Sequence, residues 1–150
     1  MATAEEIKAL REETGLSVMQ CKKALEDAGG DKTKALALLK EAGVAIAAKK
    51  GSRTLGAGTV AAYIHASGTV GTIVELLCET DFVGKNPDFK STAYEIAMHI
   101  AAMKPENTDE LLKQPFIKDP TKTIGDLVTG TIQKFGERTE IGRFVYLAIN

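Results

Sequence analysis

The fold is decided by one stretch, Glu79-Thr80-Asp81-Phe82-Val83-Gly84-Lys85-Asn86-Pro87. It follows an apolar, β-branched segment over residues 70–78 and precedes a helical pattern that Asn86 would cap and Pro87 would open. The stretch is therefore predicted to be a strand-to-helix corner that carries an acid and a large aromatic, Asp81 and Phe82. Corners of this kind lie at the surface, where an aromatic side chain gains little from burial in its own core.

Two interpretations of Phe82 are open on this evidence. In the first, the ring folds back as a plug beneath the helix that follows. In the second, the corner holds the ring outward so that it can enter another protein, and Asp81 fixes the approach. The rest of the chain has to distinguish them.

Length and composition limit the classes of function. The 150 residues suit one medium domain or a small domain joined to a larger one, and 44% hydrophobic residues suffice for a packed core. The net charge of −1 provides no basic field for nucleic acid. No apolar run approaches the roughly 20 residues of a membrane span, and Glu5 and Glu6 are unlike a signal peptide. We expect a cytoplasmic protein with no direct nucleic-acid or membrane partner.

Three short helices are predicted over residues 1–43. Capping boxes begin the first two, at Thr3 and Ser17, and Asp31 caps the third, which Gly43 is expected to end. Such a bundle has a core that is small for independent stability. Part of its surface could dock a helix or a peptide, and the residues concerned are Val18, Met19 and Lys22.

Residues 44–57 are predicted to be a helical extension that passes into a flexible linker, since they carry basic residues and no acid. Residues 58–150 are predicted to form a core. Strands over 59–65 and 70–78 make a hairpin, and the helix opened by Pro87 carries an apolar stripe until Pro105 halts it.

The rest of this core contains a short helical turn near residues 108–112, an extended segment over 114–120 and a helix capped by Thr123. A last strand runs over residues 140–149. Strands beside helices, without an alternating βαβ pattern, predict an antiparallel α+β fold.

The sequence offers no convincing catalytic centre. Its two cysteines and two histidines, at positions 21, 78, 65 and 99, lack metal-ligand spacing. Cys78 and His65 could meet across the hairpin as a thiol nucleophile and its base. Cys78 falls on the apolar strand face, however, where a thiol stays protonated and inert. His99 lies beside an apolar stripe and is expected at the surface. We therefore predict a protein that is not an enzyme and holds no cofactor or metal.

Landmarks along nearly the whole chain resemble one family. In the first domain they are Leu10-Arg11-Glu12-Glu13-Thr14-Gly15 and Cys21-Lys22-Lys23-Ala24-Leu25. In the core they are Tyr63-Ile64-His65, Val74-Glu75-Leu76, residues 78–83, 96–102 and 115–120, and Gly142-Arg143-Phe144. The string Thr-Asp-Phe-Val alone is unspecific, but the whole set in this order is specific. The chain resembles the elongation factor Ts family, the guanine-nucleotide exchange factors of translation elongation factor Tu.

The resemblance implies a fold, a partner and a site. The first domain would be a three-helix bundle of the ubiquitin-associated type. An exchange wedge, made of Thr80, Asp81, Phe82 and Val83, would press into the GTPase domain of elongation factor Tu, with Phe82 near the magnesium and phosphate site. The bundle would hold the same domain from another side, through Val18, Met19 and Lys22. His65 on the hairpin would reach a different domain of this partner.

The chain also departs from the family pattern. Leu16-Ser17 replaces a small, Gly-rich pair, and Gly84 stands where Ala or Ser is usual, which is expected to loosen the corner. The helical insertion of other members is reduced to a few residues between Pro105 and Pro115. Only one core repeat is present, where longer members carry two. One repeat presents the wedge and the hairpin only once, and a two-fold dimer would restore both surfaces. We therefore expect a symmetric homodimer through the C-terminal strand.

Two rival functions remain. One is an adaptor whose three-helix module binds a peptide or a ubiquitin-like partner and whose core is scaffold. The other is a small thiol enzyme with a reactive Cys78. The rate of GDP release from elongation factor Tu, with and without the protein, would separate both from an exchange factor.

Overall fold

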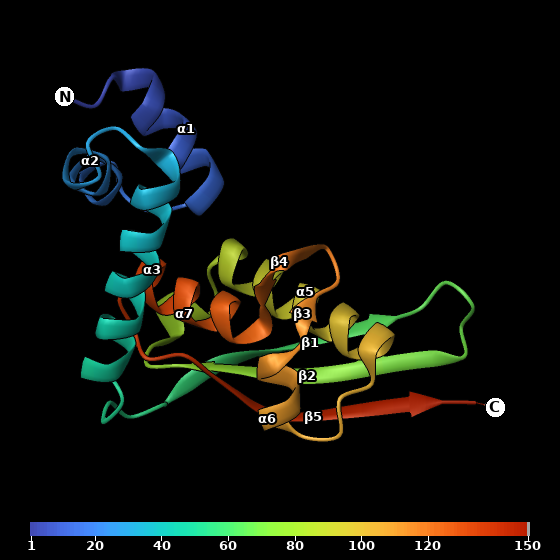
Figure 1. The fold of residues 1–150 in the computed structure, drawn as a ribbon. Helices are drawn as coiled ribbons and strands as arrows, with labels where there is room; N and C mark the ends of the chain where they lie inside the picture. The colour runs from blue at the N-terminus through green and yellow to red at the C-terminus, as the bar shows by residue number, and fades with distance from the viewer. Residues whose placement is uncertain (150) are drawn as a thin grey trace.

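The computed structural model describes residues 1–149 and begins with a bundle of three helices (Figure 1). These are α1 (Ala4–Thr14), α2 (Val18–Asp27) and α3 (Lys32–Lys49). The predicted capping boxes at Thr3 and Ser17 are present, and Gly15 ends α1 with a φ of 70°. The bundle has its own small core, which consists of Leu10, Leu16, Cys21, Ala24, Leu25, Ala35 and Leu39.

Gly43 does not end α3, so the predicted end of this helix is wrong. The residue is buried, and a Cβ there would lie 2.7 Å from Gln133 Oε1. The sequence predicted that Gly43 ends the helix. In the structure, its missing side chain instead permits close approach of another helix, α7 (Ile124–Phe135). In Figure 1, α3 descends from the bundle and passes beside α7. The predicted division at residue 43 falls inside one continuous helix, and the division into domains stays a prediction.

The core is an antiparallel sheet covered on one face by helices, as the α+β prediction requires. Its strands are β1 (Ala57–Ile64), β2 (Val70–Cys78) and β5 (Glu140–Ala148), in the order β1-β2-β5. Ala57 pairs with Cys78, and Val70 pairs with Ala148. The first pairing lies at the end of the hairpin nearest the bundle, and the second lies beside the hairpin turn (Figure 1).

Helix α5 (Pro87–Met103) lies across β1 and β2 and supplies the largest share of the core. After it come α6 (Thr108–Lys113) and a small hairpin of β3 (Pro115–Phe116) and β4 (Asp119–Thr123). The side chains buried between these elements and the sheet include Val74, Leu76, Phe89, Ile96, Ile100, Leu111 and Ile124.

His99 is buried, so its prediction as a surface residue is wrong. The N–H of Ile117 donates to Nδ1 over 3.3 Å, which leaves Nε2 to donate to Gln114 Oε1 over 2.9 Å. Both partners come from the segment after α6, which folds back over α5. The burial lowers the pKa of His99, with the Gln114 contact opposing it. The neutral imidazole therefore joins α5 to the β3–β4 hairpin.

Among the described residues, no helix lies over the opposite face of the sheet, which is largely apolar (Figure 1). Val60, Ile64, Ile73, Val145 and Leu147 on this open face are between 50% and 69% exposed. Within residues 1–149, no helix is long and apolar enough to cross a membrane.

Candidate partner-binding corner

The predicted corner is present between β2 and α5. A single turn of helix, α4 (Asp81–Gly84), fills it. Thr80 caps this turn by accepting the N–H of Val83 over 3.4 Å. Asn86 then caps α5 by accepting the N–H of Asp88 over 2.8 Å, and Pro87 occupies the first turn.

The corner presents Phe82 to solvent. The ring is 87% exposed, whereas Val83 beside it is only 4% exposed. Adjacent positions on a helix point in directions about 100° apart, so burying Val83 against the core turns Phe82 outward. The plug interpretation of Phe82 is therefore wrong for this chain. Asp81 is exposed next to the ring, so the acid and the aromatic share one accessible surface.

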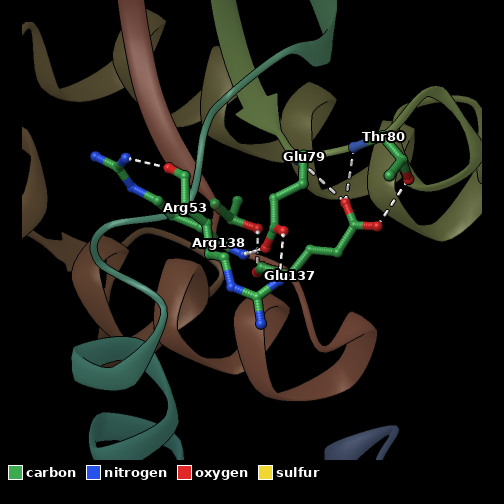
Figure 2. Close-up of polar contacts among 6 residues, drawn as sticks. Arg53, Glu79, Thr80, Glu137 and Arg138 are labelled. Atoms are coloured by element: carbon green, nitrogen blue, oxygen red, sulfur yellow. Dashed lines mark hydrogen bonds and ion pairs between the residues drawn. The ribbon is translucent and has the colours of Figure 1, made fainter.

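A network of charged side chains lies behind the corner (Figure 2). Glu137 Oε1 accepts the backbone N–H groups of Glu79 and Thr80, each over 3.0 Å, and Glu137 Oε2 accepts the Thr80 hydroxyl over 2.7 Å. Glu79 Oε2 in turn accepts the N–H of Arg138 over 2.5 Å. Its other oxygen pairs with Arg53 at 3.4 Å. The corner is thus joined to the α7–β5 loop and to the segment that follows α3.

The other predicted partner-binding residues lie away from this corner. Val18 and Met19 are 49% and 73% exposed at the start of α2, and Lys22 is exposed one turn later. His65 lies at the hairpin turn, at the far end of the sheet from the corner, where its Nδ1 is 3.1 Å from the Tyr63 hydroxyl. The three groups therefore form three separate surfaces.

Cys78 and His65 do not form a catalytic pair. Cys78 pairs with Ala57 at one end of the hairpin, while His65 follows the other end of β1. Burial, with a smaller contribution from the Glu137 charge, raises the pKa of the Cys78 thiol, as expected for an inert, apolar position. No group of three or more potential metal ligands occurs in the described part of the chain.

Comparison with known proteins identifies the family. The family profile described as "Elongation factor TS" matches residues 3–109 and 79–150. The chain is 42% identical to an elongation factor Ts of Acetivibrio thermocellus, over 97% of this chain and 88% of the relative. The corresponding protein of Rubrobacter xylanophilus is 41% identical, over 97% of this chain and 98% of the relative.

This chain belongs to the elongation factor Ts family.

Elongation factor Ts relatives differ in length from this chain. The two alignments just described span 190 and 191 positions against a chain of 150 residues, so these relatives carry residues with no counterpart here. The Clostridium kluyveri protein, 43% identical, is matched by the whole of this chain over 49% of its own length. Family membership and the names of these relatives support a role in translation elongation.

Sequence reasoning did not identify the network that holds this corner. Glu137 and Arg138 follow the Gly136 that ends α7, and they reach Glu79 across more than 50 residues of sequence. One local signal was available. An acid just after a helix C-terminus lies at the negative end of the helix dipole, where it is unfavourable unless it has other partners.

Proposed function

We propose that this protein is a guanine-nucleotide exchange factor that binds elongation factor Tu and promotes release of GDP. The exposed ring of Phe82, 87% accessible on a corner fixed by caps and charged contacts, is the observation that carries the proposal. In this proposal the exchange wedge, Thr80 to Val83, enters the GTPase domain near its magnesium and phosphate site. A large aromatic held out of its own core is typical of the anchors that dominate protein interfaces.

The proposed mechanism is differential binding and involves no covalent step. A wedge that fits the nucleotide-free conformation better than the GDP-bound one shifts the population toward the nucleotide-free form. Linkage makes the effect reciprocal, so the factor by which the wedge weakens GDP binding is the factor by which GDP weakens binding of the wedge. GTP can then enter and expel the factor unchanged. The protein would act without a cofactor, in the cytoplasm.

The separation of the three surfaces supports different roles for them. Val18, Met19 and Lys22 on α2 would anchor the GTPase domain, because they combine exposed apolar atoms with a cation and lie on a rigid helix. His65 at the hairpin turn would contact a different part of the partner. Tethered contacts raise the effective concentration of one another, so the α2 surface would raise the occupancy of the wedge.

We further propose that two copies of the chain associate through the open face of the sheet. Five large apolar side chains, Val60, Ile64, Ile73, Val145 and Leu147, are at least half exposed on neighbouring strands there. Monomeric proteins rarely expose a contiguous apolar surface of this kind without a partner. A two-fold dimer would present two wedges and two hairpin turns.

Release of a fluorescent GDP analogue from elongation factor Tu, followed by stopped flow, tests the exchange function. We expect a large acceleration by the wild-type protein and little by Phe82→Ala. Truncating an anchor of this kind costs about 2 kcal/mol or more, which corresponds to a roughly thirtyfold lower rate of GDP release. Val44→Ala is a matched control, since Val44 is a 56% exposed apolar residue on α3 away from the corner.

The same experiment separates the adaptor from the exchange factor. An adaptor would bind elongation factor Tu, or another partner, and leave the rate of GDP release unchanged. Full acceleration by Phe82→Ala would show that the wedge is not the active element.

A further inference from the structure

The exchange wedge needs support from outside its own helix. Helix α4 is a single turn, Asp81–Gly84, and helices this short are not stable in isolation. Phe82 points to solvent and contributes little internal packing. Val83 and Gly84 hold one side of the turn against the core. The N-terminal side, where Thr80 caps the turn, is held by a polar contact.

That contact is the carboxylate of Glu137. Pairing of β2 with β5 ends at Leu77, so the backbone N–H groups of Glu79 and Thr80 lie beyond this ladder. Glu137 Oε1 accepts both of them at 3.0 Å, and its Oε2 accepts the Thr80 hydroxyl at 2.7 Å. This hydroxyl is also the one that accepts the N–H of Val83 and caps α4. One side chain therefore fixes both the backbone and the capping group at the base of the wedge.

The local sequence gives no reason for an acid at this position. Glu137 follows Gly136, which ends α7 in a left-handed conformation, so its charge lies near the negative end of that helix. Its three hydrogen bonds across the fold offset this cost, because hydrogen bonds to a carboxylate are stronger than those between neutral groups. The placement of Glu137 is thus explained by the corner and not by α7.

Glu137 is itself held in place. The next residue, Arg138, donates its N–H to Glu79 Oε2, and its guanidinium donates to the Arg53 carbonyl oxygen (Figure 2). The same guanidinium also donates to Glu140 Oε1. The Thr139 hydroxyl donates to the carbonyl oxygen of Glu137 over 3.2 Å. The loop that carries Glu137 is therefore tied to the start of the corner at Glu79 and to the segment that follows α3.

We propose that Glu137 is the positioning residue of the exchange wedge, and that its carboxylate holds Thr80, and hence Phe82, in the orientation that the partner receives. This inference rests on the proposed function of Phe82. Glu137 lies behind the corner and acts through Thr80. Its effect is preorganisation, since a corner that is ordered before binding does not have to be ordered at the expense of binding energy.

The proposal predicts which kinetic quantity changes. The encounter with elongation factor Tu is assigned to the α2 surface, and the wedge enters only as GDP leaves. A loosened corner should therefore lower the maximal rate of GDP release at saturating factor and leave the half-saturating concentration nearly unchanged. Loss of folded protein would do the reverse, because it removes active molecules and raises the half-saturating concentration.

The test compares Glu137→Ala and Glu137→Gln with wild type and with Glu41→Ala. Glu41 is an exposed acid on α3 with no ion pair or side-chain hydrogen bond among residues 1–149, so it controls for the loss of charge. We expect Glu137→Ala to lower the maximal rate about tenfold, the factor that corresponds to one hydrogen bond to a charged group. Glu137→Gln keeps an acceptor oxygen and should lose less. A higher half-saturating concentration with an unchanged maximal rate would overturn the proposal.

Hydrogen exchange on the free proteins supplies a second readout that does not depend on exchange activity. In Glu137→Ala the amides of Glu79 and Thr80 should lose protection, while those in the centre of β2 keep it. Unchanged protection of both amides would overturn the positioning role even if the nucleotide-exchange rates had fallen. A different outcome is that Glu137→Ala loses this protection while the wild-type protein fails to accelerate GDP release from elongation factor Tu. That outcome would contradict the proposed function and leave the structural role of Glu137 standing.

Discussion

Gly84 in α4 lies directly against the backbone of Gly58 in β1. A Cβ on Gly84 would be 2.9 Å from the Gly58 carbonyl oxygen and 3.3 Å from its carbonyl carbon and nitrogen. The sequence suggested that a glycine at this position loosens the corner. The packing indicates the opposite, because the missing side chain lets the wedge lie flat on the sheet edge, and only a backbone shift would make room for a larger residue.

Gly84→Ala should therefore destabilise the fold, by about 1 kcal/mol. Overpacking against backbone costs about 1–3 kcal/mol, and the better helix propensity of Ala recovers up to about 1 kcal/mol of it. Urea denaturation measures the change. Gly130→Ala on α7 is the control, since a Cβ there meets nothing within 4 Å; it should be neutral or stabilising. If Gly84→Ala and Gly130→Ala had the same free energy of unfolding, the backbone of β1 at Gly58 would be shown to shift without loss of stability.

Removing residues 1–50 should leave a folded core that binds elongation factor Tu about a hundredfold more weakly, because the tethered α2 surface is lost. The fragment should also be less stable than the core of the whole chain, because Ile46 and Ala47 of α3 pack against that core. Circular dichroism of residues 51–150 and a binding titration check both points. An unchanged affinity would show that the bundle is no anchor, and an unfolded fragment would contradict the boundary.

Periodicity and capping chemistry predicted the hairpin, the corner and the start of α7 correctly, because each depends on neighbours in the sequence. Thr123 caps α7 as predicted, and it forms a capping box with Asp126 three residues later. Contacts between distant segments were not predictable in this way. The chemistry of glycine alone predicts a helix stop at Gly43, whereas contact with α7 determines its role. The corner's support at Glu137 comes from a segment far along the chain.

His99 should make the fold sensitive to mild acid. Its pKa is lowered in the folded protein, mainly by burial, from an ordinary value of 6.5. A base with a depressed folded pKa gives full stability above its unfolded pKa, and that stability is lost as pH falls from about 6.5 toward the folded value. Protonation would also remove Nδ1 as an acceptor for the N–H of Ile117.

Urea denaturation at pH 7.5 and pH 5.5 measures this dependence. Wild type should lose stability between the two, and His99→Gln, which cannot titrate, should lose less. His65→Gln is the control, because His65 is exposed at the hairpin turn and its replacement should leave the loss unchanged. Identical pH dependence in wild type and His99→Gln would contradict the assignment.

The open sheet face yields the last prediction, which concerns assembly. Ala62, Ile73 and Val145 are paired across the three strands, and Ile64, Gly71 and Leu147 form the next row. Side chains directly opposite one another on antiparallel strands share a face, so these rows make one continuous apolar surface. Beside them Arg143 donates to both carboxylate oxygens of Glu75, at 2.9 and 2.8 Å, which holds the pKa of Glu75 at about 2.

We expect light scattering after size exclusion at micromolar concentration to give the mass of two chains. Introducing Val145→Lys together with Leu147→Lys should yield a monomer, because two charges would then be buried without partners in a face-to-face contact. Val44→Lys, at a comparably exposed apolar position on α3, should stay dimeric. In a dimer, the wedge of one copy and the hairpin turn of the other could contact the same elongation factor Tu. If they do, the monomeric double variant should have lower exchange activity than the wild type. A wild-type monomer with full exchange activity would rule this assembly out.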